Sequence, residues 1–354
     1  MVCLGRRCAY KFCGGGRTLV EATNKAYEGE YQGEQAIWLR SGPYEAAVLP
    51  QIGANLIAFR DTSRGYAFLR EPAEDGMEAF KANPGVHGIP VLFPPNRYDA
   101  GKFPWEGTTY QFPVNETARG NHLHGFAHTT PWRVDSYGAD DRESRVTLSL
   151  TVGEGHPVYA YMPFEFTLKL QYALSEEGLL QRVSVRNNGA KRLPCLLAFH
   201  TAVNAPFAPG SQTSDVGFKL TIGKRWELSG DRMLPTGRFQ PLTAGEEKMR
   251  DGGQSPFFEA MDNHYTSQTQ NGRNYMELTD SRAGVKLVYD VGVGYKMWMI
   301  WNNFAQGGFF CPEPQVNLVN APNVDLPAED IGLIGLEKGE IWEETSRLYT
   351  IDIG

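Results

Sequence analysis

The chain has 354 residues, of which 41% are hydrophobic, 12% are aromatic and 21% are charged, and its formal net charge is -7. This composition is typical of a globular protein, and the aromatic content favours β-strands. The acidic balance without a basic block argues against nucleic acid or an acidic membrane as the main partner, and no run of about 20 apolar residues is present for a membrane helix. We expect a small neutral ligand instead.

The first residues are predicted to lie outside the fold. Cys3, Cys8 and Cys13 stand in a Gly- and Arg-rich stretch, but their spacing is not that of a usual zinc pair, and the stretch lacks the apolar core of a secretory signal. Because five cysteines cannot all pair, a disulfide framework is not expected and the cytoplasm is the predicted compartment. We predict an N-terminal extension over residues 1–25 and one domain over residues 26–354.

From residue 26 onward the sequence predicts short strands separated by turns. Residues 164–172 alternate strictly between apolar and polar side chains, as in a half-buried antiparallel strand. Turns at 175–178 and 187–189 enclose a second strand, so a meander is expected here and an all-β sandwich overall. In chain order, we expect a short helix at 74–81, strands at 146–152, 164–172, 179–185 and 216–222, a short helix at 243–250, and strands at 285–289 and 295–301.

Three of the seven histidines lie close together at His122, His124 and His128. In an extended strand, side chains two residues apart project to the same face, so His122 and His124 would point together and Leu123 away from them. Gly125 then allows the backbone to turn or a ligand to come close. This pattern is compatible with metal binding, with a sugar or acid/base site, or with polar residues on an open sheet face.

Further polar residues stand where the backbone is rigid or opens into a loop. Arg97 belongs to the Pro- and Gly-rich loop of residues 85–98, and His200 ends an apolar run, where its pKa can be tuned near neutral. Glu313 stands between two prolines, whose restricted backbone angles preorganise a general base. Asp262 belongs to another polar cluster, at residues 262–265. Taken singly, each residue also has a structural interpretation, as an ion pair, a core histidine or a loop cap.

Together these motifs resemble the aldose 1-epimerase (galactose mutarotase) family. They occur in the family's order and cover roughly residues 46–349. The residues that carry the resemblance are Asn96-Arg97, Asn121-x-x-His124-Gly125 followed by Trp132, His200-Thr-Ala-Val-Asn204, Asp262, and Glu313-x-Gln315 followed by Asn323. The resemblance implies a large antiparallel β-sandwich, the galactose mutarotase-like supersandwich, with the sugar site on one concave sheet.

The resemblance also implies roles for individual residues in interconverting sugar anomers. The family's chemistry needs one acid and one base and no cofactor or metal. We expect the charged form of the general acid to be favoured by a nearby carboxylate. The implied roles are general base for Glu313, general acid for His200, assistance at the ring oxygen for His124, and binding of an aldohexose by Asn96, Arg97, Asp262 and Gln315. Ala202 and Val203, and the prolines beside the base, depart from the family's usual pattern and put the galactose preference in doubt.

Several alternatives remain open at this point. A non-catalytic carbohydrate-binding or sugar-sensing protein can use the same scaffold, because a fold does not determine function. A metalloenzyme would use the three clustered histidines, and a phosphorylated hexose would meet Arg97, Lys102 and Arg119. Aromatic side chains can stack on a sugar face, although in a β-sandwich they more often belong to the core. The tryptophans considered for stacking are Trp105, Trp132, Trp298 and Trp301.

Overall fold

The structure is a computed structural model that describes residues 24–354, which form 27 β-strands and two α-helices. The predicted extension over residues 1–25, with Cys3, Cys8 and Cys13, lies outside the described residues except for its last two positions. Its boundary and the single domain after it stay predictions. No helix in residues 24–354 is long and apolar enough to cross a membrane.

The N-terminal strands form a five-stranded antiparallel sheet in sequence order. Each strand pairs with the next through a short turn, which is the simplest connection between antiparallel strands. Its strands are β1 (Lys25–Tyr31), β2 (Glu34–Ser41), β3 (Tyr44–Leu49), β4 (Asn55–Asp61) and β5 (Tyr66–Ala67).

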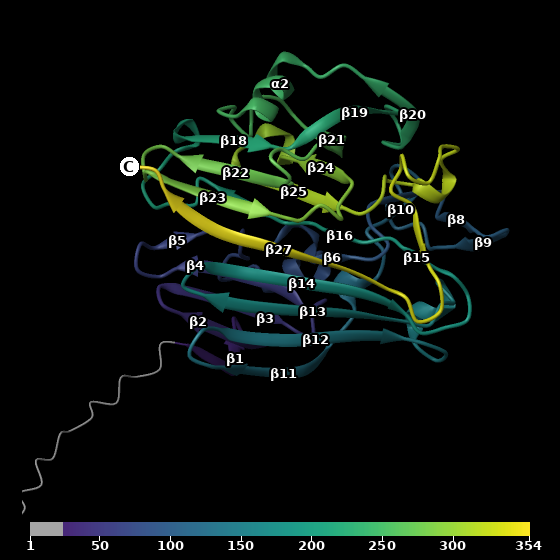
Figure 1. Cartoon of the computed structure of the whole chain (residues 1–354), viewed down its shortest axis with the longest axis horizontal. Coiled ribbons are helices and arrows are strands. Elements are labelled where there is room, and N and C mark those ends of the chain that lie inside the picture. The colour runs from purple at the N-terminus through teal and green to yellow at the C-terminus, as the bar shows by residue number, and fades with distance from the viewer. Residues whose placement is uncertain (1–23) are drawn as a thin grey trace, which may run out of the picture.

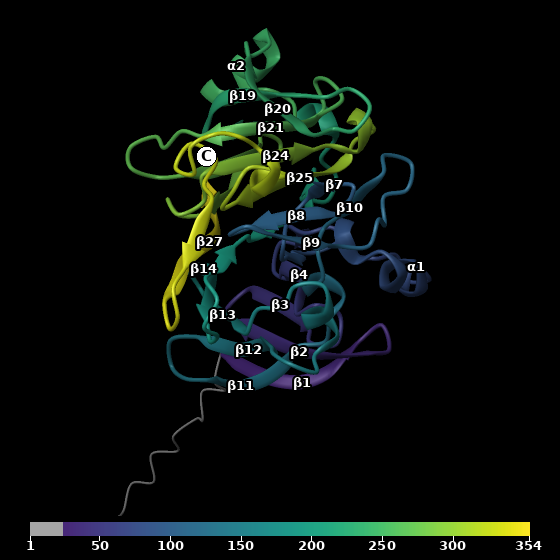
Figure 2. The same ribbon diagram turned by 90° about the vertical axis from the view of Figure 1, so that its right-hand side faces the viewer.

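A long eight-stranded antiparallel sheet forms one face of the molecule (Figures 1 and 2). The predicted meander lies here: Phe166 pairs with Asn187 and Ser175 with Gly178 across two strands. Phe166, Leu168, Leu170 and Tyr172 are buried on one face, as their alternation predicts. The order is β11 (Arg133–Ala139), β12 (Ser144–Val152), β13 (Phe166–Ser175), β14 (Gly178–Asn187), β27 (Ile341–Asp352), β23 (Val285–Asp290), β22 (Tyr275–Asp280) and β18 (Val216–Leu220).

A second eight-stranded sheet carries most of the predicted site residues. Its main path is β20 (Pro235–Gln240), β19 (Ile222–Leu228), β21 (Asp262–Ser267), β24 (Met297–Trp301), β25 (Gly308–Gln315), β16 (Ala198–Phe199) and β6 (Val91–Leu92), and β17 (Val203–Ala205) also pairs with β25. The single strand expected over residues 216–222 is therefore wrong. The chain passes between sheets at Thr221, whose buried hydroxyl donates to Asn274 Oδ1 at 2.7 Å.

The remaining elements are short and lie at the edges of these sheets. Both predicted helices exist, shifted by one to three residues, and the second begins with a capping box formed by Thr243 and Glu246. The two-stranded sheets are β7 (Arg97–Asp99) with β10 (Asn121–Leu123), β8 (Lys102–Trp105) with β9 (Thr108–Gln111), and β15 (Leu193–Cys195) with β26 (Ile334–Leu336). The helices are α1 (Met77–Ala82) and α2 (Ala244–Asp251).

The long sheet is shared by two packing partners (Figures 1 and 2). The five-stranded sheet lies against its β11–β13 end, where β1, β2 and β3 contact β11, β12 and β13. The second eight-stranded sheet lies over the β18 end, where the Phe218 ring is 5.1 Å from the ring of Phe310. The hydrophobic core runs continuously between the long sheet and both of its packing partners. The fold is a large antiparallel β-sandwich, as predicted.

Candidate active site

All predicted site residues except Gln315 line one cavity, and Gln315 lies directly behind it. The cavity has a volume of about 280 Å³, near the lower limit of roughly 300–1,000 Å³ for small-molecule pockets, which suits a single sugar ring. Gln315 Nε2 donates to Glu313 Oε2 at 3.3 Å. The predicted residues that line the cavity are Asn96, Arg97, His124, His200, Asp262 and Glu313.

The register of three neighbouring strands places the floor of the cavity. Met299 pairs with Glu313 across β24 and β25, and two residues further along Trp301 pairs with Asp262 of β21. Because alternate residues of a strand share a face, these four side chains project to the same side of the sheet. All four line the cavity. The strand ladder therefore determines the spacing between Glu313 and Asp262.

His200 and Glu313 form the closest acid/base pair of the cavity. His200 Nε2 lies 3.2 Å from Glu313 Oε1, and the two side chains are 5% and 0% exposed. Burial lowers the pKa of His200 to about 4 and raises the pKa of Glu313 well above its usual range, because both charged forms lose their hydration. The expectation that the charged form of His200 is favoured is therefore wrong, because desolvation dominates and the neighbouring Glu313 is itself held in its neutral form by burial.

Arg97 is clamped between two carboxylates. Its Nε donates to both oxygens of Glu116 at 3.1 Å, and its Nη2 lies 3.3 Å from Asp262 Oδ2. The Arg97 side chain is only 9% exposed, so the pair is largely removed from water. The clamp holds the guanidinium and the Asp262 carboxylate in a defined position at the cavity wall. Sequence reasoning missed Glu116, which stands 19 residues after Arg97 and shares no motif with it.

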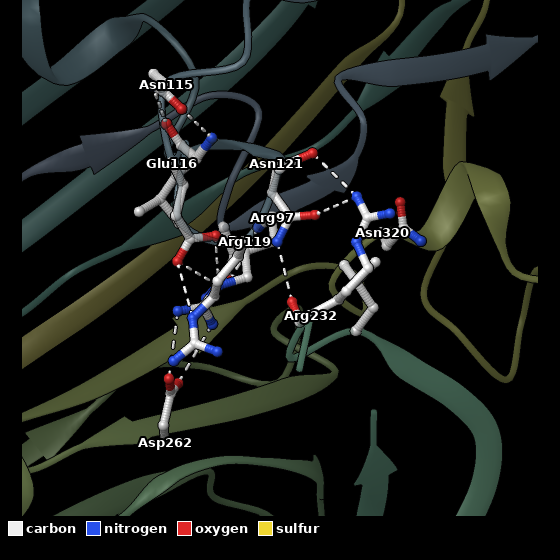
Figure 3. Close-up of polar contacts among 12 residues, drawn as sticks. Arg97, Asn115, Glu116, Arg119, Asn121, Arg232, Asp262 and Asn320 are labelled. Atoms are coloured by element: carbon white, nitrogen blue, oxygen red, sulfur yellow. Dashed lines mark hydrogen bonds and ion pairs between the residues drawn. The ribbon is translucent and has the colours of Figure 1, made fainter. Parts of the chain in front are cut away.

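A polar network outside the cavity supports the clamp (Figure 3). Asn121 Nδ2 donates to Glu116 Oε2 at 3.0 Å, and Arg119 Nε lies 3.4 Å from Glu116 Oε1. Arg232 donates to Asn121 Oδ1 at 3.2 Å and pairs with Asp99 at 2.6 Å. The segment from Glu116 to Asn121 is thereby tied to the β19–β20 connection. Glu116 is held from behind while it faces Arg97.

The basic residues considered for a phosphate do not converge. Only Arg97 lines the cavity, and its charge is matched by Glu116 and Asp262. Arg119 pairs with Glu116 and donates to the Asp231 carbonyl at 3.0 Å, whereas Lys102 is exposed on β8 and does not line the cavity.

His122 diverges from the other two clustered histidines, whose rings lie 6.2 Å apart, and the predicted common face of His122 and His124 is wrong. Strand β10 ends at Leu123, and His124 takes a left-handed conformation with φ 66°, which reverses the alternation. The His124 ring then lies 5.2 Å from that of His200, whereas His122 Nδ1 lies 2.8 Å from the Pro113 carbonyl oxygen. Within residues 24–354, no group of three or more His, Cys, Asp or Glu side chains is placed to hold a metal ion.

Two left-handed backbone positions, Asn96 and Gly125, shape the cavity wall. Asn96 has φ 56°, its Nδ2 donates to Met299 Sδ at 2.9 Å, and its Oδ1 accepts from the Arg97 amide at 2.9 Å. Gly125 has φ 63°, and a Cβ there would stand 2.4 Å from the Pro94 carbonyl oxygen, so no other residue fits. These backbone positions bring His124 and Arg97 to the same wall.

Of the four tryptophans considered for sugar stacking, only Trp301 lines the cavity. Trp132 and Trp298 are buried in the core, and Trp105 lies under Arg192, with the guanidinium 5.7 Å from its ring centre. The ring of Trp301 is 6.4 Å from that of His200. The cavity thus has one aromatic wall beside its acid/base pair.

The sequence matches the aldose 1-epimerase family over residues 35–349. A galactose mutarotase-like protein from Clostridium acetobutylicum is 32% identical, with a TM-score of 0.88 over 92% of this chain and 98% of that one. Galactose 1-epimerase from Lactobacillus acidophilus NCFM shares the fold, with a TM-score of 0.71 and 16% identity over 94% of this chain and 99% of that one.

The Escherichia coli K12 protein YihR is 27% identical over 168 residues. That match spans about half the length of each protein, 47% of this chain and 49% of YihR. The family match, in contrast, extends from the second strand to the last one. The chain therefore belongs to the aldose 1-epimerase family.

Proposed function

We propose that this protein is an aldose 1-epimerase that interconverts the α and β anomers of a free, neutral aldohexose. The observation that carries the proposal is the contact of 3.2 Å between His200 Nε2 and Glu313 Oε1 in a cavity of about 280 Å³. A sugar that reaches this pair meets one proton donor and one proton acceptor. A protein that only binds a sugar does not need such a matched pair.

The proposed reaction transfers one proton in each direction. Glu313 accepts the proton of the anomeric hydroxyl while His200 donates a proton to the ring oxygen, so the bond between C1 and the ring oxygen breaks and an aldehyde forms. Rotation about the C1–C2 bond presents the other aldehyde face, and reclosure returns both protons. His124, whose ring lies 5.2 Å from that of His200, would assist at the ring oxygen. Asn96, Arg97 and Asp262 would hold the sugar.

For this cycle, His200 and Glu313 must together carry one transferable proton. Without a sugar, burial favours the neutral forms of both His200 and Glu313. A bound sugar changes this balance, because its anomeric hydroxyl donates to the carboxylate and its ring oxygen accepts from the imidazole. Hydrogen bonds to the charged forms favour those forms. Substrate binding would therefore prepare the charged pair that ring opening consumes.

The charges around the cavity favour an uncharged sugar. Arg97 already has two carboxylate partners, Glu116 and Asp262, and Glu313 adds a third acidic group nearby. A phosphate would have to displace one of these partners and would meet the remaining carboxylates, which costs energy in a buried site.

Cys195 and Cys311 are buried free thiols, which supports the cytoplasmic location that we include in this proposal.

Polarimetry of freshly dissolved α-D-glucose, α-D-galactose and D-glucose 6-phosphate tests the proposal. We expect the wild-type protein to accelerate the approach to equilibrium rotation for at least one neutral hexose but not for the phosphate. Glu313→Gln should lose about 10²- to 10⁴-fold of that acceleration, the usual worth of a general base. The matched control is Glu343→Gln, exposed on β27 and outside the cavity. Saturable binding without acceleration would instead support a sugar-binding protein.

A further inference from the structure

The connection between β24 and β25 has an unfavourable backbone. Asn303, Phe304 and Ala305 have φ angles of 49°, 56° and 61° in succession. Residues with a Cβ rarely adopt this left-handed conformation, and usually only one at a time. Three in a row persist only where the surroundings hold them, and such strain is concentrated at functional sites.

Asn302 supplies that hold from within the protein. It is fully buried, and its Oδ1 accepts hydrogen bonds from the amides of Ala305 at 3.2 Å and Met261 at 2.9 Å. Its Nδ2 donates to the carbonyl oxygens of Pro256 at 3.0 Å and Glu259 at 2.6 Å. The turn is therefore anchored to the segment before β21 and is a built feature of the fold.

The turn presents an aromatic ring to solvent beside the cavity. Phe304 is 69% exposed, the highest exposure among the large hydrophobic side chains of residues 24–354 that stand out at the surface. Its ring lies 6.3 Å from that of Trp301 at 81°, an edge-to-face arrangement. Trp301 lines the cavity, so Phe304 extends its aromatic wall outward. Exposing a phenylalanine on a strained turn gives no benefit to folding.

The strand register shows in which direction this wall extends. Glu313 pairs with Met299, whereas Trp301 and its partner Asp262 stand two residues nearer the β24–β25 connection, roughly 7 Å along the strands. A sugar with its anomeric carbon at Glu313 and its remote hydroxyls at Asp262 therefore lies across β24 and extends toward the end of that strand, next to the connection that carries Phe304.

We propose that Phe304, together with Trp301, forms a subsite for the second sugar unit of a reducing disaccharide. This inference rests on the proposed epimerase function, because it uses the orientation of the sugar in the cavity. The cavity of about 280 Å³ takes the reducing unit with its free anomeric carbon. The second unit leaves the cavity at the Asp262 end, where the apolar face of its ring can pack on the exposed Phe304 ring.

The test compares lactose with its component D-galactose and with D-glucose. Phe304→Asn removes the ring but keeps a residue that tolerates the left-handed conformation, so the turn is retained. Phe304→Tyr keeps the ring. The control is Phe239→Asn, since Phe239 is also exposed, at 45%, but packs on Trp226 away from the cavity. Anomer exchange is followed by polarimetry and sugar binding by calorimetry.

We expect Phe304→Asn to lower kcat/KM for lactose about three- to tenfold, the usual worth of one aromatic contact, and to change it less than twofold for the monosaccharides. Phe304→Tyr should restore the lactose value, and Phe239→Asn should match wild type. Equal effects on lactose and monosaccharides, or none, would overturn the subsite. If wild type accelerates no sugar, the epimerase proposal fails, and calorimetry decides the subsite alone: equal loss of lactose and galactose binding in Phe304→Asn would overturn it.

Discussion

The buried pair of His200 and Glu313 leads to a specific prediction for the pH dependence of anomer exchange. The value of kcat/KM reports the ionisation of the free enzyme, and the proposed cycle works only while the pair holds one proton. The value of kcat/KM falls at acidic pH, when a second proton binds to the pair. Since burial raises the pKa of Glu313 and lowers that of His200 to about 4, the second proton enters near pH 4 rather than near the ordinary histidine value.

The size of the predicted effect follows from comparing the two possible pKa values of His200. With an acid limb at the ordinary histidine pKa of about 6.5, roughly 9% of the plateau kcat/KM would remain at pH 5.5. With the limb at about 4, the pKa of buried His200, almost the whole plateau value remains at that pH. The two cases differ about tenfold at a single pH.

The assay is polarimetry of a neutral hexose between pH 4.5 and pH 8, with the spontaneous rate subtracted at each pH. Far-UV circular dichroism at each pH shows whether the fold persists. Glu313→Gln, measured in parallel, corrects for any remaining catalysis that does not involve the pair. A half-maximal kcat/KM near pH 6.5, with the fold intact, would refute the claim that burial controls the protonation of His200.

Two more predictions concern residues around the cavity. Glu116→Gln removes one charged partner of Arg97 and should raise KM about tenfold with little change in kcat, because Glu116 does not reach the acid/base pair; steady-state kinetics would check this, and an equal fall in kcat would count against it. His264 is fully buried and has a pKa lowered to about 3, so its stabilising contribution is present above about pH 6.5 and is lost as the pH falls. Between pH 8 and pH 5.5 the wild type should therefore lose about 1.4 kcal/mol of its free energy of unfolding through this group, whereas His264→Leu should not. Urea unfolding in which the difference between the two proteins stays constant with pH would contradict the lowered pKa of His264.

Most of the fold was predictable because its signals are local. The alternation from Phe166 to Tyr172 has the period of a half-buried strand, and the observed strand buries these positions. The helix at Ala244–Asp251 carries its own start signal in Thr243 and Glu246. The failure at Thr221 is of another kind, because a strand that leaves one sheet for another keeps its local pattern. The change of sheet depends on tertiary contacts with Asn274.

The candidate site was predictable in its residue types but not in its geometry. The order of motifs identified Arg97, His200 and Glu313, and the structure places them around one cavity. The alternation rule failed at His124 because the strand ends at Leu123 and His124 takes a left-handed conformation, so the extended geometry that the rule requires is absent. Glu116 had no local signal, because its link to Arg97 forms only when β7 and β10 pair.

The protonation state of His200 shows why residue type alone does not determine chemistry. A carboxylate beside a histidine raises its pKa when both groups remain hydrated, and the sequence supports that expectation. In the structure the carboxylate stands 3.2 Å away, yet both groups are almost completely buried. Desolvation therefore lowers the pKa of His200 and raises the pKa of Glu313. Burial depends on strands far apart in sequence, because His200 directly follows β16 and Glu313 lies on β25. The same packing that brings the pair together therefore makes its charged state depend on what enters the cavity.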